Sequence, residues 1–159
     1  MAEAKTNAMR IVEKAKVNFS VLSYEVGDSL DGVTAAEKLG RGVEEVYKTL
    51  IARGAKKEIY VFIIPVAEEL NLKLAARSVG EKNMEMVRLD ELLGLTGYIR
   101  GGCSPIGMKK RYRTVIDSSA QSRNTVIVSA GKRGLQLEMD PRDLANLTGA
   151  SFDKIIFDK

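Results

Sequence analysis

Residues 59–64, Ile-Tyr-Val-Phe-Ile-Ile, have an apolar or aromatic side chain at every position. Because strand side chains alternate between the two faces of a sheet, such a run predicts a central strand that is buried on both faces. The apolar segment 48–53 precedes it, and Gly54-Ala55-Lys56-Lys57-Glu58 between them has the length of a hairpin loop. We therefore expect the two strands to pair antiparallel, with other elements covering both faces of the second.

The rest of the chain alternates between helical and strand-like patterns. Helices are predicted over 6–16, 34–39, 72–79, 89–93 and 141–148, and strands over 19–26, 114–117, 125–129 and 135–139. Asp140-Pro141 suits a helix start, and Gly94 is a plausible stop for the fourth helix. Because residues 135–139 alternate apolar and polar, we expect an outer strand there. This order predicts an α+β (mixed α/β) fold: one domain over 1–159, with a mixed, largely antiparallel sheet or partial barrel surrounded by helices.

Composition excludes several kinds of chemistry. The chain has no histidine and one cysteine, so histidine-dependent triads and zinc sites built from histidine or several cysteines are impossible. No Walker loop or dinucleotide fingerprint is present, and we expect no cofactor and no metal. A lone cysteine forms no internal disulfide, no apolar run approaches the length of a membrane span, and the N-terminus Met-Ala-Glu-Ala-Lys-Thr lacks the apolar core of a secretion signal. We therefore expect a cytoplasmic protein without a membrane partner. The net charge of +4 permits a polyanionic partner without requiring one.

The segment 96–110 is a glycine-rich loop flanked by cations. Adjacent Gly101 and Gly102 could aim backbone N–H groups at an oxyanion or a phosphate, or could simply connect two elements. Cys103 is a candidate nucleophile if Arg100 or nearby lysines depress the pKa of its thiol, but a lone cysteine is more often inert packing. Lys48 begins an apolar strand, where lysine is usually solvated and sometimes functional. Residues 129–134, Ser-Ala-Gly-Lys-Arg-Gly, suit either an anion-binding turn or an ordinary hairpin.

Four motifs in one order resemble the YbaK-type aminoacyl-tRNA deacylases, which are similar to the editing insertion domain of bacterial prolyl-tRNA synthetase. The motifs are Val-Tyr-Lys-Thr-Leu at 46–50, Ile-Pro-Val at 64–66 followed by Leu-Asn-Leu-Lys at 70–73, Thr-Gly-Tyr at 96–98 with Gly-Gly-Cys-Ser-Pro-Ile-Gly at 101–107, and Val-Ser-Ala-Gly-Lys-Arg-Gly-Leu at 128–135. The resemblance covers nearly the whole chain. It implies hydrolysis of cysteine mischarged on proline tRNA, with the substrate thiol attacking its own ester carbonyl.

The resemblance also implies roles for individual residues. Lys48 would hold the 3′-terminal nucleotide, while N–H groups of Gly101 and Gly102 would stabilise the carbonyl oxyanion. The implied substrate-binding residues are Tyr24, Leu30, Cys103, Ser104, Pro105 and Ser129. Among these, Pro105 would keep the loop rigid, and the thiol of Cys103 would be dispensable. Relatives carry an aromatic residue where this chain has Leu30 and Asp31, and some carry an acidic residue at the position of Gln136.

Several functions remain open on the sequence alone. The leading hypothesis is a Cys-tRNA(Pro) deacylase that acts in trans on the acceptor end of aminoacyl-tRNA, in a transient complex with prolyl-tRNA synthetase. A deacylase for alanine or serine is the closest alternative. A non-catalytic module that binds tRNA or a synthetase, and a thiol-dependent enzyme that uses Cys103, are the others.

Overall fold

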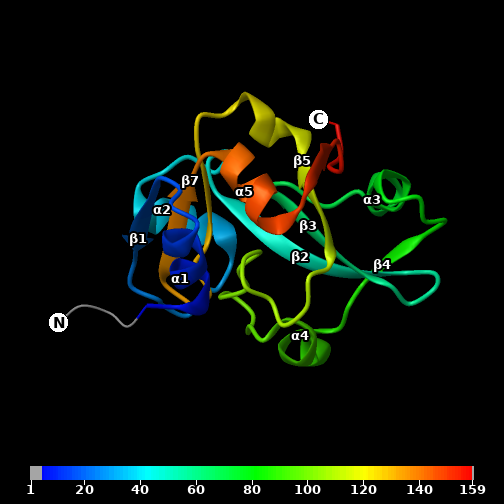
Figure 1. Ribbon diagram of the computed structural model, residues 1–159, viewed down its shortest axis with the longest axis horizontal. Coiled ribbons are helices and arrows are strands. Elements are labelled where there is room, and N and C mark those ends of the chain that lie inside the picture. The colour runs from blue at the N-terminus through cyan, green and yellow to red at the C-terminus, as the bar shows by residue number, and fades with distance from the viewer. Residues whose placement is uncertain (1–4, 159) are drawn as a thin grey trace.

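The computed structural model describes residues 5–158 of the chain (Figure 1). Its helices are α1 (Asn7–Lys14), α2 (Gly32–Leu39), α3 (Leu72–Ser78), α4 (Leu89–Thr96), α5 (Pro141–Thr148) and the 3₁₀ helix η1 (Ser118–Ser122). Its strands are β1 (Phe19–Ser23), β2 (Tyr47–Gly54), β3 (Ile59–Pro65), β4 (Met84–Met86), β5 (Arg113–Asp117), β6 (Val126–Ser129), β7 (Leu135–Met139) and β8 (Ser151–Asp153).

The strands form two sheets, one of five strands in the order β4-β2-β3-β5-β8 and one of three in the order β1-β7-β6. Among the described residues, four of the six strand pairings are antiparallel, and the β3–β5 and β5–β8 pairings are parallel. The sheets meet where Val46, just before β2, forms a parallel bridge with Ile127 of β6. The predicted mixed, largely antiparallel α+β fold is confirmed.

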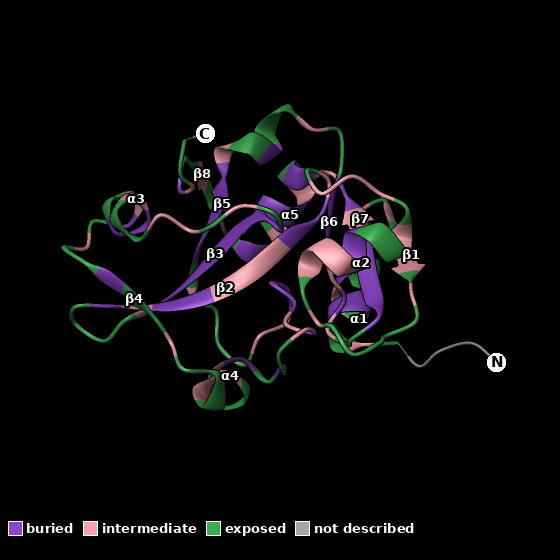
Figure 2. Ribbon diagram, turned by 180° about the vertical axis from the view of Figure 1, so that it is seen from behind, coloured by how far each residue is buried: buried purple, intermediate pink, exposed green. Residues whose placement is uncertain are grey.

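Strand β3 is the central strand that its apolar run predicts. It pairs antiparallel with β2, where Lys48 lies opposite Ile64, and parallel with β5 on its other side. Val61 and Ile63 contribute to one hydrophobic cluster, whereas Phe62 and Ile64 contribute to a second cluster that includes α3. Figure 2 shows that β3 is buried along its length. Both faces of β3 are therefore covered.

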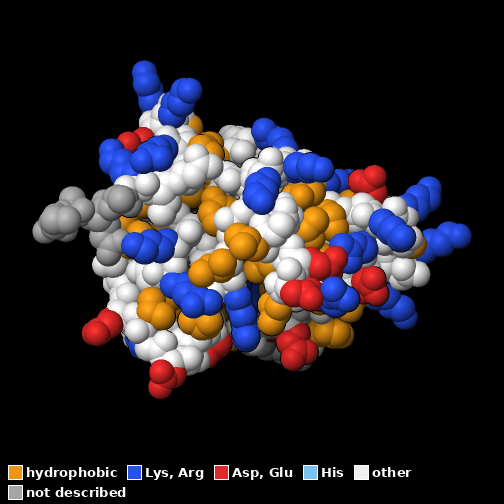
Figure 3. All heavy atoms as spheres, turned by 90° about the horizontal axis from the view of Figure 1, so that it is seen from below, with side chains coloured by type: hydrophobic (Ala, Val, Ile, Leu, Met, Phe, Trp, Pro, Cys, Tyr) orange, Lys and Arg blue, Asp and Glu red, His pale blue; other side chains and the backbone are white. Residues whose placement is uncertain are grey.

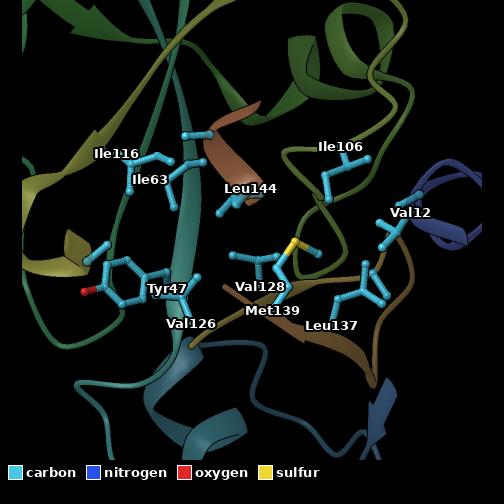
Figure 4. Packing of buried hydrophobic residues seen from close by; sticks show 14 of the residues in the cluster. Val12, Tyr47, Ile63, Ile106, Ile116, Val126, Val128, Leu137, Met139 and Leu144 are labelled. Carbon is cyan, nitrogen blue, oxygen red and sulfur yellow. The ribbon is translucent and has the colours of Figure 1, made fainter. Parts of the chain in front are cut away.

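The larger cluster joins the two sheets. Figure 4 shows Ile63 and Ile116 of the five-stranded sheet close to Val128 and Met139 of the three-stranded sheet, with Leu144 of α5 between them. Helix α1 adds the fully buried Val12. This shared core holds β2, and with it the predicted site residue Lys48, in a fixed position relative to β6 and β7.

Two expectations from the sequence are corrected by the structure, and two short strands were missed. Helix α4 continues through Gly94 and ends at Gly97, whose φ of +86° provides the left-handed cap. Strand β7 is the central strand of its sheet and not an outer one. The carboxylate of Glu138 on this strand forms an ion pair with Arg41. A strand that alternates apolar and polar side chains can therefore lie inside the sheet. The short strands β4 and β8 were not predicted, since three residues carry little periodic signal.

The helix starts follow the sequence. Thr6 accepts a hydrogen bond from the N–H of Met9 at 3.1 Å, and Asp140 caps α5 with Pro141 in its first turn. Within residues 5–158, no helix combines the length and the apolar character that crossing a membrane would require. The assignment of residues 1–159 to a single domain stays a prediction.

Candidate functional site

A cavity of about 350 Å³ opens between the first half of β2, the approach to α2, the segment from β4 to α4, and the glycine-rich loop. Six of the nine predicted site residues line it: Tyr24, Leu30, Lys48, Gly101, Cys103 and Ser129. These residues come from five separate segments of the sequence, and the fold brings them around one space. Gln136 of β7, where relatives differ, also lines the cavity.

Lys48 is the half-buried cation of this cavity. Burial lowers the pKa of its ammonium group, since desolvation disfavours the charged form. The carboxylates of Glu69 and Glu68 act in the opposite direction and favour the charged form. Lys48 lies on β2 opposite Ile64 of the buried strand β3. Its position is therefore fixed by strand pairing.

The glycine-rich loop contains a tight turn at its start. The N–H of Gly102 donates a hydrogen bond to the carbonyl oxygen of Ile99 at 3.0 Å, which closes a four-residue turn. Gly101 occupies the third position of this turn with φ of +83°, as in a type II turn. The expectation that both glycines direct N–H groups at the substrate is therefore wrong for Gly102. The N–H of Gly101 donates to no protein group among the described residues, and Gly101 lines the cavity.

Three predicted residues lie behind the cavity wall. Gly102, Ser104 and Pro105 are buried and are not among the described residues that line the cavity. The hydroxyl of Ser104 accepts a hydrogen bond from the N–H of Ile106 at 3.2 Å, so it shapes the loop from within. The expectation that Ser104 and Pro105 contact the substrate is therefore wrong. The loop turns their side chains into the protein, where they support the loop from behind the cavity wall.

Cys103 lines the cavity but is a poor nucleophile. Burial raises the pKa of its thiol to about 11, although a hydrogen bond with Thr96 acts in the opposite direction. No nearby cation, such as Arg100 or Lys110, is among the causes of this pKa shift. Only a very small fraction of the thiol is ionised near neutral pH, which argues against a thiol-dependent enzyme.

The turn that follows β6 packs directly on the glycine-rich loop. A Cβ atom on Gly102 would lie 3.1 Å from the backbone nitrogen of Arg133, so only glycine allows this approach without a shift. The Nε of Arg133 donates a hydrogen bond to the carbonyl oxygen of Arg100 at 2.8 Å. Ser129 lines the cavity while its hydroxyl accepts a hydrogen bond from the N–H of Gly131 at 3.2 Å. The two loops thus form one wall.

Leu30 and Asp31 have separate roles at the approach to α2. Leu30 lines the cavity, and its Cβ would lie 3.5 Å from a Cβ built on Gly101. Asp31 is the N-cap of α2 and accepts a hydrogen bond from the N–H of Thr34 at 2.8 Å. Hydrogen bonds from Ser29 and Thr34 lower the pKa of Asp31 to about 2. Asp31 is thus a helix cap that also lines the cavity.

The mouth of the cavity has an apolar and cationic rim that the sequence did not reveal. Met86, Arg88 and Leu89 line the cavity at the junction of β4 and α4. Leu89 is 63% exposed, and Leu93, one turn further along α4, is 54% exposed. Figure 3 shows hydrophobic side chains interspersed with basic and acidic ones on the face that carries α4, where Arg88 forms an ion pair with Asp90. The short strand β4, which gave no sequence signal, is what places this rim.

Thr49 and Arg100 are among the further cavity residues that the sequence did not identify. Thr49 follows Lys48 on β2 and lines the cavity, and its buried hydroxyl has no hydrogen-bond partner among the described residues. Arg100 also lines the cavity, next to Gly101. In the sequence, these two residues were marked by their positions next to the predicted site residues Lys48 and Gly101. No cluster of His, Cys, Asp or Glu residues that could hold a metal ion occurs within residues 5–158.

Comparison with known proteins places this site in a family. Residues 30–147 match the model of the aminoacyl-tRNA editing domain. The chain is 44% identical over 154 residues to a protein of Enterococcus faecalis named "Putative Cys-tRNA(Pro)/Cys-tRNA(Cys) deacylase EbsC", covering 96% of this chain and 94% of that one. The chain therefore belongs to the aminoacyl-tRNA editing domain family, as its motifs predict.

Two further similarities are more distant. The chain is 30% identical over 136 residues to a proline–tRNA ligase of Staphylococcus aureus, which covers 79% of this chain and 24% of the ligase. A crystal structure titled "putative trans-editing enzyme for prolyl tRNA synthetase" superposes with a TM-score of 0.80 at 23% identity, covering 98% of this chain and 100% of that one. The latter likeness concerns the fold alone.

Proposed function

We propose that the protein is an aminoacyl-tRNA deacylase that removes cysteine from mischarged tRNA(Pro) in trans. The observation that carries this proposal is the cavity itself, where the half-buried Lys48 and the unpaired N–H of Gly101 line one space in a chain of the editing family. The name of the Enterococcus faecalis relative supports the choice of cysteine.

The reaction that we propose needs no protein nucleophile. The substrate thiol gives up its proton to solvent, from which the ribose oxygen later takes one up, and its sulfur attacks the carbonyl carbon of the same aminoacyl ester. The carbonyl oxygen becomes an oxyanion, which the Gly101 N–H stabilises. When the tetrahedral intermediate collapses, the bond to the ribose oxygen breaks, that oxygen takes up a proton, and a cyclic thioester of cysteine leaves. Lys48 holds the 3′-terminal nucleotide so that the ester lies within reach of the Gly101 N–H.

The rim at the cavity mouth fits the unpaired end of a tRNA. Single-stranded nucleotides are bound by cations that contact phosphates and by surfaces on which bases pack. Arg88 supplies a cation at the mouth, and the exposed Leu89 supplies an apolar surface beside it. We therefore place the acceptor end of the tRNA along this rim, with the aminoacyl group inside.

Selection of tRNA(Pro) requires more than this rim, because contacts to phosphates and to the faces of bases do not distinguish one base from another. The similarity to a part of proline–tRNA ligase supports a transient complex in which the synthetase contributes tRNA identity. The cytoplasm, where aminoacylation occurs, is the location that we propose, in keeping with a single half-buried cysteine.

A deacylase for alanine or serine is the second candidate. A volume of about 350 Å³ lies at the small end of ligand pockets, and the aliphatic Leu30 stands where relatives carry an aromatic side chain. A small pocket separates near-isosteric amino acids poorly, whereas a requirement for a substrate thiol separates them by chemistry.

A panel of tRNA(Pro) charged with cysteine, alanine, serine or proline tests the proposal. We expect the protein to release cysteine over many turnovers and to release alanine and serine at least ten times more slowly. Faster release of alanine or serine would establish the second candidate. Stoichiometric binding without ester loss would establish a non-catalytic module.

A further inference from the structure

The turn that contains Gly101 has two possible orientations of its central peptide. That peptide joins the carbonyl of Arg100 to the N–H of Gly101, and type I and type II turns differ mainly by a rotation of this unit through about half a turn. The φ of +83° at Gly101 identifies the type II arrangement. Because glycine tolerates either sign of φ, the residue alone does not hold one arrangement.

The contact that selects the orientation comes from outside the cavity. Arg133 Nε donates a hydrogen bond of 2.8 Å to the Arg100 carbonyl oxygen. Arg100 and Gly101 are among the described residues that line the cavity, but Arg133 is not. Since the C=O and N–H of a trans peptide point in opposite directions, a carbonyl held by Arg133 turns the Gly101 N–H away from Arg133.

The second glycine is fixed by independent contacts. The Gly102 N–H donates a hydrogen bond to the carbonyl oxygen of Ile99, and the backbone nitrogen of Arg133 lies 3.1 Å from the position of a Cβ on Gly102. The ends of the turn are thereby held, and the central peptide is the part that can still rotate. A Cβ on Gly101 would lie 3.4 Å from Arg133 Nε, so the guanidinium is close to this peptide.

We infer that Arg133 is a positioning residue, whose hydrogen bond to the Arg100 carbonyl keeps the Gly101 N–H directed into the cavity as the oxyanion donor. This inference rests on the proposed function for its catalytic consequence. Its structural part, the orientation of one peptide, stands independently. Without Arg133 the peptide can rotate, and the Arg100 carbonyl oxygen would then face the developing negative charge.

The inference predicts a loss in the catalytic step and not in binding. Arg133→Met keeps an unbranched apolar stem and removes every donor, whereas Arg133→Lys keeps the charge and a donor. With Cys-tRNA(Pro) as substrate, we expect Arg133→Met to lower kcat at least tenfold with KM within about twofold of wild type, because the oxyanion exists only in the transition state. We expect Arg133→Lys to recover part of the loss.

Lys110→Met is the matched control, since it removes an exposed cation that follows the same loop. We expect its kcat to equal that of wild type. The inference is overturned if Arg133→Met and Lys110→Met change kcat equally, if Arg133→Met raises KM alone, or if kcat stays within twofold of wild type.

Amide resonances measured by ¹H–¹⁵N NMR separate failure of this inference from failure of the proposed function. In Arg133→Met we expect the Gly101 amide to shift and its hydrogen exchange to change, while the Gly102 amide, held by Ile99, changes less. An unchanged Gly101 amide would overturn the inference even if wild type is an active deacylase. A changed Gly101 amide in a protein that cleaves no aminoacyl-tRNA would support the positioning role and contradict the proposed function.

Discussion

The N–H of Gly102 donates to the carbonyl oxygen of Ile99 at 3.0 Å, and this single hydrogen bond divides the roles of two adjacent glycines. It leaves Gly101 as the residue that presents an N–H to the cavity, while Gly102 provides a close approach between two loops. The importance of the Gly-Gly pair is thus partly chemical and partly steric.

Alanine substitutions at the two glycines should differ in their effects. Gly101→Ala places a side chain at φ of +83°, a conformation that costs an L-residue about 1–2 kcal/mol, and leaves its N–H in place. Gly102→Ala puts a Cβ 3.1 Å from backbone of the neighbouring turn, which must move. We expect Gly102→Ala to lower both the free energy of unfolding and kcat. Urea unfolding and deacylation kinetics check this, and a Gly102→Ala protein with wild-type stability and kcat would contradict the loop contact.

Cys103 should be inert as a nucleophile. With the pKa of its thiol raised from 9.0 to about 11, the thiolate population near neutral pH falls about 100-fold. We expect Cys103→Ser to keep wild-type deacylation. Iodoacetamide should alkylate Cys103 at least tenfold more slowly than free cysteine, as followed by mass spectrometry. Rapid alkylation with parallel loss of activity would revive the thiol-dependent alternative.

Lys48 should titrate below the usual lysine value of 10.5, since burial lowers its pKa. Glu69 favours the charged form, so Glu69→Gln should lower the pKa further. If the charged form binds the nucleotide, binding weakens as pH rises through this lowered pKa. Titration of the Lys48 side chain by ¹³C NMR measures the pKa in both proteins. An unchanged pKa in Glu69→Gln would show that the carboxylate does not act on Lys48, and a higher pKa would contradict the expected direction.

The rim at the cavity mouth should contribute to affinity for RNA. Arg88→Glu should raise KM for aminoacyl-tRNA. It should also lower the slope of log KM against log salt concentration by about one, as expected when one phosphate contact is lost. Arg142→Glu alters an exposed arginine that does not line the cavity and serves as the control. Equal effects of the two substitutions would indicate a general charge effect and no binding site at the rim.

The fold was predictable where local sequence determines local structure. The apolar run at 59–64 predicts β3, and Asp140-Pro141 predicts the start of α5, because burial and capping leave direct marks in the sequence. Strand β7 was misjudged because Glu138 looks exposed in sequence, whereas Arg41, about 100 residues away, pairs with it. Strand β4 depends on pairing with β2 and has almost no pattern of its own.

The site was predictable only in part, for a related reason. The motifs predict the segments that line the cavity, and Lys48, Gly101 and Ser129 do lie there. The direction of an individual N–H or side chain depends on tertiary contacts such as that between Gly102 and Ile99. The buried placement of Ser104 follows from the path of the loop and could not be read from residue type. The catalytic roles of these residues remain predictions.

Deacylation of Cys-tRNA(Pro) by wild type and Lys48→Ala, with substrate in at least tenfold excess over protein, tests the central claim most directly. Lys48→Arg serves as the matched variant that keeps the charge. We predict multiple turnovers by wild type, loss of at least 100-fold in kcat/KM in Lys48→Ala, and a smaller loss in Lys48→Arg. Cysteine release by Lys48→Ala at the wild-type rate, or no turnover by wild type, would contradict the account.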